Sequence, residues 1–143
     1  TRGSGDMYSK GANILHMVRT LIDDDAQWRA ILRGLNTEFY HQTVTSRQIE
    51  DYINARTEVD LTAFFDQYLR TTMIPELEVQ RSNNRLRYRW SHCVDGFDMP
   101  VRVRAGEEWM WLQPGTDWQE VTTTGAGEIA ADVQFYVKLR RVP

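Results

Sequence analysis

VDLTAFFDQYLRTTMIPELEV, residues 59–79, contains the point at which the spacing of apolar residues changes. Up to residue 69 the apolar residues recur three or four positions apart, the spacing of one helix face: Leu61, Phe64, Phe65, Tyr68 and Leu69. Ile74-Pro75 ends this pattern, because proline disfavours helical backbone in the residue before it. Leu77 and Val79 then alternate with polar neighbours, as in a strand. The segment therefore predicts a change from helix to strand at residue 75.

Three more helices are predicted upstream. Apolar residues at helical spacing indicate a helix over 6–22, and a second stripe from Trp28 to Phe39 follows the N-cap candidates Asp23-Asp24-Asp25. Thr45 and Gln48 have the spacing of a capping box, which marks the start of the third helix. With the helix after Asp60, the first 75 residues predict a four-helix unit.

The segment 76–143 has the alternation of strands. Asn83-Asn84 and Pro114-Gly115 supply turn residues between alternating runs. Trp109-Met110-Trp111-Leu112 is apolar on both faces and predicts a central strand, and the longest alternation runs from Ile129 to Leu139. Six or seven short strands predict a small antiparallel β-sandwich. The expected class is α+β, with domains at 1–75 and 76–143.

Composition limits the possible functions. The chain has 143 residues, 41% of them hydrophobic and 26% charged, which suits a globular protein with a real core. A formal net charge of −3 gives no reason to expect a nucleic-acid partner, and no apolar run is long enough to predict a membrane span. The single cysteine, Cys93, leaves the compartment open.

Several residue clusters could carry chemistry, and each has an ordinary structural explanation. His16, His41 and His92 are scattered, which favours surface or capping roles over metal binding. His92 and Cys93 are neighbours that would face opposite sides of a strand, so adjacency alone makes no catalytic dyad. The acidic run at 23–25 lacks the spacing of a calcium loop.

A set of arginines and a set of tryptophans each allow both a functional and an ordinary structural interpretation. A stripe of arginines suggests either a phosphate-binding face or a solvated strand face paired with acidic residues: Arg81, Arg85, Arg87 and Arg89. Three tryptophans suggest either core filling or a sugar-binding platform, which would require them exposed in one plane: Trp109, Trp111 and Trp118. The ordinary explanation is expected for both sets.

The order of several segments resembles the M1 family of zinc aminopeptidases. The segments are Asp6-Met7-Tyr8-Ser9-Lys10-Gly11-Ala12 with Ile14-Leu15-His16-Met17-Val18-Arg19 after it, Val44-Thr45-Ser46, 60–69, the exit Ile74-Pro75-x-Leu77, and 97–101. In that family a Tyr-x-Lys-Gly element starts a helix in the later part of a thermolysin-like catalytic domain, so a helix start is expected at Tyr8. The resemblance covers most of the chain and is closest over 6–77.

The resemblance implies a role for Tyr8. In the family this tyrosine points at the zinc-bound substrate carbonyl, and its hydroxyl hydrogen-bonds the oxyanion of the tetrahedral intermediate. A phenol suits this role because it stays a neutral donor at pH 7. Gly11 would then allow close packing beneath the site.

The family's zinc motif, His-Glu-x-x-His with a later glutamate, does not occur in the chain, nor does its Gly-x-Met-x-Asn type of segment. We therefore expect a C-terminal fragment of a zinc aminopeptidase, whose partners in the parent are a peptide substrate and the N-terminal part of the catalytic domain. We expect these 143 residues alone to bind no zinc and to hydrolyse no peptide. The implied location is bacterial, exported or periplasmic. The alternative is a non-catalytic helical-plus-β-sandwich interaction module.

Overall fold

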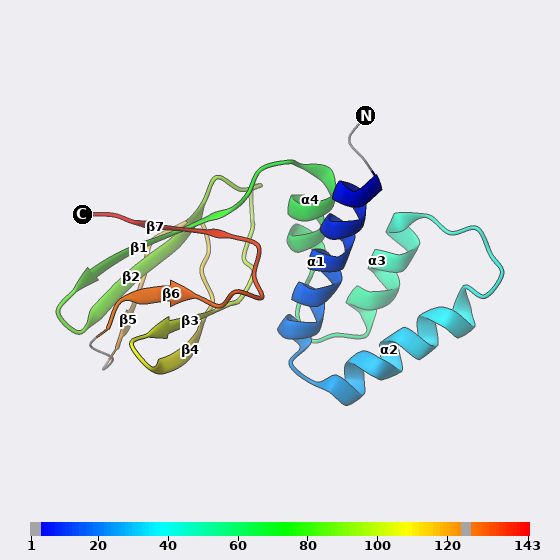
Figure 1. Cartoon of the computed structure of the whole chain (residues 1–143), viewed down its shortest axis with the longest axis horizontal. Coiled ribbons are helices and arrows are strands. Elements are labelled where there is room, and N and C mark those ends of the chain that lie inside the picture. The colour runs from blue at the N-terminus through cyan, green and yellow to red at the C-terminus, as the bar shows by residue number, and fades with distance from the viewer. Residues whose placement is uncertain (1–3, 124–126) are drawn as a thin grey trace. The chain divides into compact units, whose positions relative to one another are not determined.

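The computed structural model describes residues 4–123 and 127–143, with side chains from residue 13 onward. Four helices precede seven strands, which confirms the predicted α+β class and the order of its two halves (Figure 1). The chain divides into two compact units, Thr1–Thr62 and Ala63–Pro143. The predicted domain boundary at 75 marks the change from helix to strand, whereas the compact units meet at residue 62.

The first unit contains helices α1 (Ser4–Ile22), α2 (Asp25–Glu38) and α3 (Ser46–Ala55). Helix α2 is capped by Asp24, which accepts the backbone N–H of Gln27. Thr45 caps α3 in a full capping box with Gln48, as the sequence predicts. The aromatic rings of Phe39 and Tyr52 meet edge to face, with their centroids 5.8 Å apart.

The second unit contains helix α4 (Thr62–Arg70), apart from its first residue, and all the strands. A four-stranded sheet has the order β5-β2-β1-β7, formed by β1 (Glu76–Ser82), β2 (Arg85–Ser91), β5 (Gln119–Thr122) and β7 (Lys138–Arg141). A three-stranded sheet has the order β4-β3-β6, formed by β3 (Val101–Ala105), β4 (Glu108–Leu112) and β6 (Ile129–Ala131). The arrangement is sandwich-like.

The core of the second unit follows the predicted alternation. Leu77, Leu86 and Trp90 are buried from one sheet, and Val101 and Val103 from the other. Trp90 also satisfies its indole N–H by donating to the carbonyl of Met99, 3.0 Å away. Burial of large apolar side chains of this kind supplies most of the free energy that favours folding.

Three strand predictions are wrong. The alternation from Ile129 to Leu139 predicts one strand, but the chain turns at Asp132, whose carboxylate accepts the N–H of Gln134. The chain thus leaves the three-stranded sheet after β6, and β7 pairs with β1 in parallel, which corrects the expectation of a purely antiparallel fold. Strand β4 is an edge strand and not a central one, because its only strand partner in the described ranges is β3.

Candidate functional site

Tyr8 and Gly11 lie inside helix α1, which begins at Ser4, so the Tyr-x-Lys-Gly element is not at the helix start that the sequence suggested. Their side chains fall outside the described set, and the role implied for Tyr8 stays a prediction. Leu15 is 47% exposed, whereas Ile14 and Met17 are buried.

The three histidines are not brought together. His16, His41 and His92 are all exposed, and the backbone of His41 and His92 has positive φ, at 56° and 55°. Positive φ is uncommon outside glycine but is tolerated by histidine in tight turns. Among residues 13–123 and 127–143 no group of three His, Cys, Asp or Glu side chains is placed to hold a metal ion. The described donor set therefore does not fit a zinc site.

Cys93 and His92 lie in a bend after β2, so the expectation that they occupy a strand is wrong. Cys93 is half-buried, and burial raises the pKa of its thiol, with a smaller contribution from the charge of Asp95. A raised pKa keeps the thiol protonated and weakens it as a nucleophile. This environment is that of a structural cysteine.

The predicted arginine stripe separates into two places. Arg81 pairs with Leu86 across the hairpin and lines a groove of about 320 Å³ with Arg141 and Ile129. The other three arginines, Arg85, Arg87 and Arg89, alternate with buried Leu86, Tyr88 and Trp90 and so lie on the opposite face of β2. Arg89 donates to Glu78 at 2.6 Å, and Arg85 lies 3.8 Å from Glu120. Ion pairing of this kind supports the solvated strand face over a phosphate site.

The three tryptophans also separate. Trp118 lies beside the guanidinium groups of Arg87 and Arg89, at 5.1 and 4.6 Å from the ring centroid. Trp109 and Trp111 lie on β4 in the other sheet and are 50% and 39% exposed, so the expectation that they fill the core is wrong. No platform of three coplanar tryptophans is formed by them, which removes the support for a sugar-binding surface of that kind.

Trp109 and Trp111 belong instead to a Trp–Arg ladder with Arg102 and Arg104. The pairs Arg104–Trp109 and Arg102–Trp111 lie directly across β3 and β4. The guanidinium of Arg102 is 5.2 Å from the Trp109 ring and 5.7 Å from the Trp111 ring, and Arg104 is 5.5 Å from Trp109. Cation–π contacts stabilise by about 0.5–1 kcal/mol each at exposed sites. Asp132 neutralises Arg102 at 2.5–2.8 Å.

The acidic run at 23–25 is structural. Asp24 caps α2, and Asp25 pairs with Arg19 at 3.0 Å, which lowers the pKa of the Asp25 carboxyl through the hydrogen bond and the opposite charge. These contacts account for Asp24 and Asp25 without a bound cation.

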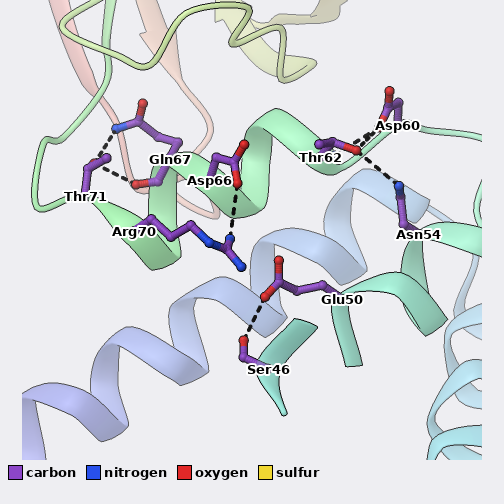
Figure 2. A network of polar contacts seen from close by, with 9 residues as sticks. All are labelled: Ser46, Glu50, Asn54, Asp60, Thr62, Asp66, Gln67, Arg70 and Thr71. Atoms are coloured by element: carbon purple, nitrogen blue, oxygen red, sulfur yellow. Dashed lines mark hydrogen bonds and ion pairs between the residues drawn. The ribbon is translucent and has the colours of Figure 1, made fainter. Parts of the chain in front are cut away.

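Sequence reasoning missed two groups of polar contacts, and Figure 2 draws part of each. In the first unit, Asp60 accepts both the N–H and the hydroxyl of Thr62, and the backbone hydrogen bond is the main cause of its lowered pKa. Asn54 accepts the N–H of Leu61 at 2.7 Å. The buried carboxylate of Glu50 accepts the hydroxyl of Ser46 at 2.8 Å. The contacts of Asp60 and Asn54 hold the turn that leads into α4, whereas the Ser46–Glu50 contact lies within α3.

The second network is centred on Gln67 of α4, which is fully buried. Its amide nitrogen donates to the hydroxyl of Thr71 and the carbonyl of Met73, and its amide oxygen accepts the N–H of Val94. A Gln inside an apolar helix stripe is the one sequence signal for such a network, since a buried amide needs partners.

Comparison with known proteins adds no assignment. No protein-family model matches the chain, and no curated protein matches it either. Within the described residues, no helix has both the length and the apolar character that crossing a bilayer requires.

Proposed function

We propose that the chain is the C-terminal part of an M1-like zinc aminopeptidase, which removes N-terminal residues from peptides, and that Tyr8 donates a hydrogen bond during the reaction. The observation that carries the proposal is the order of segments that resemble the family, from Tyr8-x-Lys10-Gly11 to Ile74-Pro75-x-Leu77. Its support also includes the succession of four helices and two sheets. The thermolysin-like character of the helices is part of this proposal.

The chemistry assigned to this chain is electrostatic. A neutral phenol at position 8 would donate its proton in a hydrogen bond to the substrate oxygen that gains negative charge. Loss of one such donor costs about 3–4 kcal/mol of transition-state stabilisation in comparable enzymes. Because the described residues do not fit a zinc site, the metal's ligands belong to the rest of the parent in this proposal, and no step through the metal is derived.

The test uses the full-length gene product that contains these residues. We expect it to release the chromophore from an aminoacyl p-nitroanilide, and we expect Tyr8→Phe to lower kcat by about 100- to 1,000-fold with little change in KM. Tyr40→Phe is the matched control, because Tyr40 is highly exposed on the first unit. The 143 residues alone should give no turnover. An inactive full-length protein, or a Tyr8→Phe variant with full kcat, would refute the proposal.

The second candidate is the non-catalytic interaction module. The exposed pair Trp109 and Trp111 favours it, since tryptophan is enriched at protein interfaces. An upstream His-Glu-x-x-His in the parent gene, together with peptidase activity, would exclude this candidate.

A further inference from the structure

Strand β4 presents an unusual edge to solvent. It ends the three-stranded sheet, and the two residues at its middle that face outward are Trp109 and Trp111. Both rings are substantially exposed. Sheet edges normally carry lysine, proline or a bulge that blocks pairing with another strand. The edge strand β7 follows that rule, with Lys138, Arg140 and Arg141, but β4 does not.

The hairpin geometry shows which backbone groups of β4 are free. Only Gly106 and Glu107 separate β3 from β4, and the closing pair of a two-residue hairpin is hydrogen-bonded. Hydrogen-bonded and non-hydrogen-bonded residue pairs alternate along an antiparallel ladder, so the backbone groups of residues 108, 110 and 112 form the hydrogen bonds to β3. The N–H and C=O groups of Trp109 and Trp111 therefore point away from β3. None of the backbone hydrogen bonds outside the described ladders involves either residue.

We propose that this edge pairs with the same edge of a second copy of the chain, in antiparallel orientation about a two-fold axis at Met110. The sequence Trp109-Met110-Trp111 reads the same in both directions. Pairing centred on Met110 places Trp109 opposite Trp111 of the second copy, and Trp111 opposite its Trp109. These are the residues with free backbone groups, so the register forms four new hydrogen bonds and two cross-strand Trp pairs.

Charge permits this contact. The only charged residue of β4 is Glu108, which in this register lies opposite Leu112 of the second copy. Arg102, one strand away, is already neutralised by Asp132 of its own copy. Like charges directly opposite each other would destabilise a strand pair, and this pairing creates no such contact.

The area involved predicts a weak dimer. A tryptophan side chain buries roughly 150–250 Å² in full, so the exposed parts of four rings supply only about 400 Å². Stable interfaces bury at least about 1,200 Å² in total. Even with the strand backbone included, the contact belongs to the weak class. The dimer should therefore depend on concentration, and the inference stands independently of the proposed peptidase function.

The first experiment is sedimentation equilibrium of the chain over micromolar to millimolar concentrations. We expect reversible dimerisation that is weakened at least tenfold by Trp111→Lys, which places a charge on the free edge. Thr122→Lys is the matched control, because Thr122 is exposed on the edge strand β5 of the other sheet. This substitution should leave the dimer dissociation constant unchanged. A chain that stays monomeric throughout, or a Trp111→Lys variant that dimerises as well as the parent, would overturn the proposal.

A cross-link tests the register without destabilising the edge. In a Cys93→Ser background, Met110→Cys should form an intermolecular disulfide under mild oxidation. Cα atoms in a non-bonded antiparallel pair are about 4.5 Å apart, within the range a disulfide spans. Glu120→Cys on β5 should not cross-link above the level of random collision. Equal cross-linking of the two variants would contradict pairing at Met110.

Discussion

The side-chain oxygen of Gln67 accepts the backbone N–H of Val94 at 2.7 Å, across 27 residues of sequence. The same amide donates to Met73 in the segment that leads to β1. One buried side chain thus holds three parts of the second unit together: helix α4, the connection to the first strand, and the loop after β2.

Replacement of Gln67 by leucine should therefore destabilise the second unit by about 1–3 kcal/mol, because it removes two part-buried hydrogen bonds and leaves the backbone groups of Val94 and Met73 without these partners. Urea unfolding followed by tryptophan fluorescence measures the change. Gln113→Leu, at an exposed position, is the control and should change stability by less than about 0.5 kcal/mol. Equal effects of the two substitutions would mean that the Gln67 network contributes little.

Tyr68 should make the stability of the second unit sensitive to alkaline pH. Its hydroxyl donates to the carbonyl of Tyr136 at 2.8 Å, and burial, with a contribution from Tyr136, raises its pKa above the ordinary value near 10. The folded state therefore favours the neutral phenol. Its contribution is complete below about pH 10 and is lost as the pH rises from there towards the folded pKa.

Tyr68→Phe tests this linkage. The variant should lose about 1–2 kcal/mol at neutral pH through the missing hydrogen bond. Between pH 10 and 11 it should lose less additional stability than the parent. Urea unfolding at a series of pH values measures both effects, and an identical pH dependence in the two proteins would contradict the assignment.

Gly34 should be required by its contact with Tyr52. A Cβ atom at position 34 would lie 1.9 Å from the Tyr52 hydroxyl, so the ring must move if alanine is introduced. Alanine in a helix is otherwise favoured over glycine by about 1 kcal/mol. We expect Gly34→Ala to destabilise the first unit nonetheless.

A Gly34→Ala, Tyr52→Phe double variant separates the gain in helix propensity from the clash with the Tyr52 hydroxyl. In a Tyr52→Phe background the closest atom is gone, and Gly34→Ala should cost at least about 1 kcal/mol less than in the parent. Thermal unfolding of all four proteins gives the coupling energy. Additive effects would show that some other contact requires the glycine.

Cys93 should react slowly with alkylating reagents in the folded protein. Burial is the main cause of its raised pKa and Asp95 the second, so the thiolate fraction at pH 8 is small. We expect iodoacetamide to modify the native chain at least several-fold more slowly than the urea-unfolded chain. Asp95→Asn should recover only part of the difference, and a full recovery would make charge, not burial, the dominant cause.

Local signals predicted much of the fold. The capping-box spacing of Thr45 and Gln48 predicted the start of α3, and Pro75 predicted the change from helix to strand. Asn83, a predicted turn residue, adopts the positive φ of 57° that its turn requires. Such features depend on neighbours in sequence. The position of Arg81 was predictable too, because a two-residue turn at 83–84 sets it opposite Leu86, on the other face from Arg85.

Features that depend on distant residues were not predictable. The strand ends at Asp132, whose carboxylate is held by Arg102, thirty residues away. The alternation of apolar residues continues past Asp132 and therefore gives no sign of this end. The edge position of β4 is fixed by the pairing of β3 with β6 on its other side. Tyr8 was identified by resemblance alone, and its role awaits the kinetic test.

The parallel pairing of β1 with β7 has a consequence for biosynthesis. It joins Glu76 to Lys138 and so cannot form until some sixty intervening residues have been made. Closing a loop of this length costs entropy before any contact is gained, which slows folding. On the ribosome, one side of β1 would stay uncovered while the hairpin to β2 is already complete. Nascent chains that stall between β2 and β7 should therefore be the forms that chaperones must protect from aggregation.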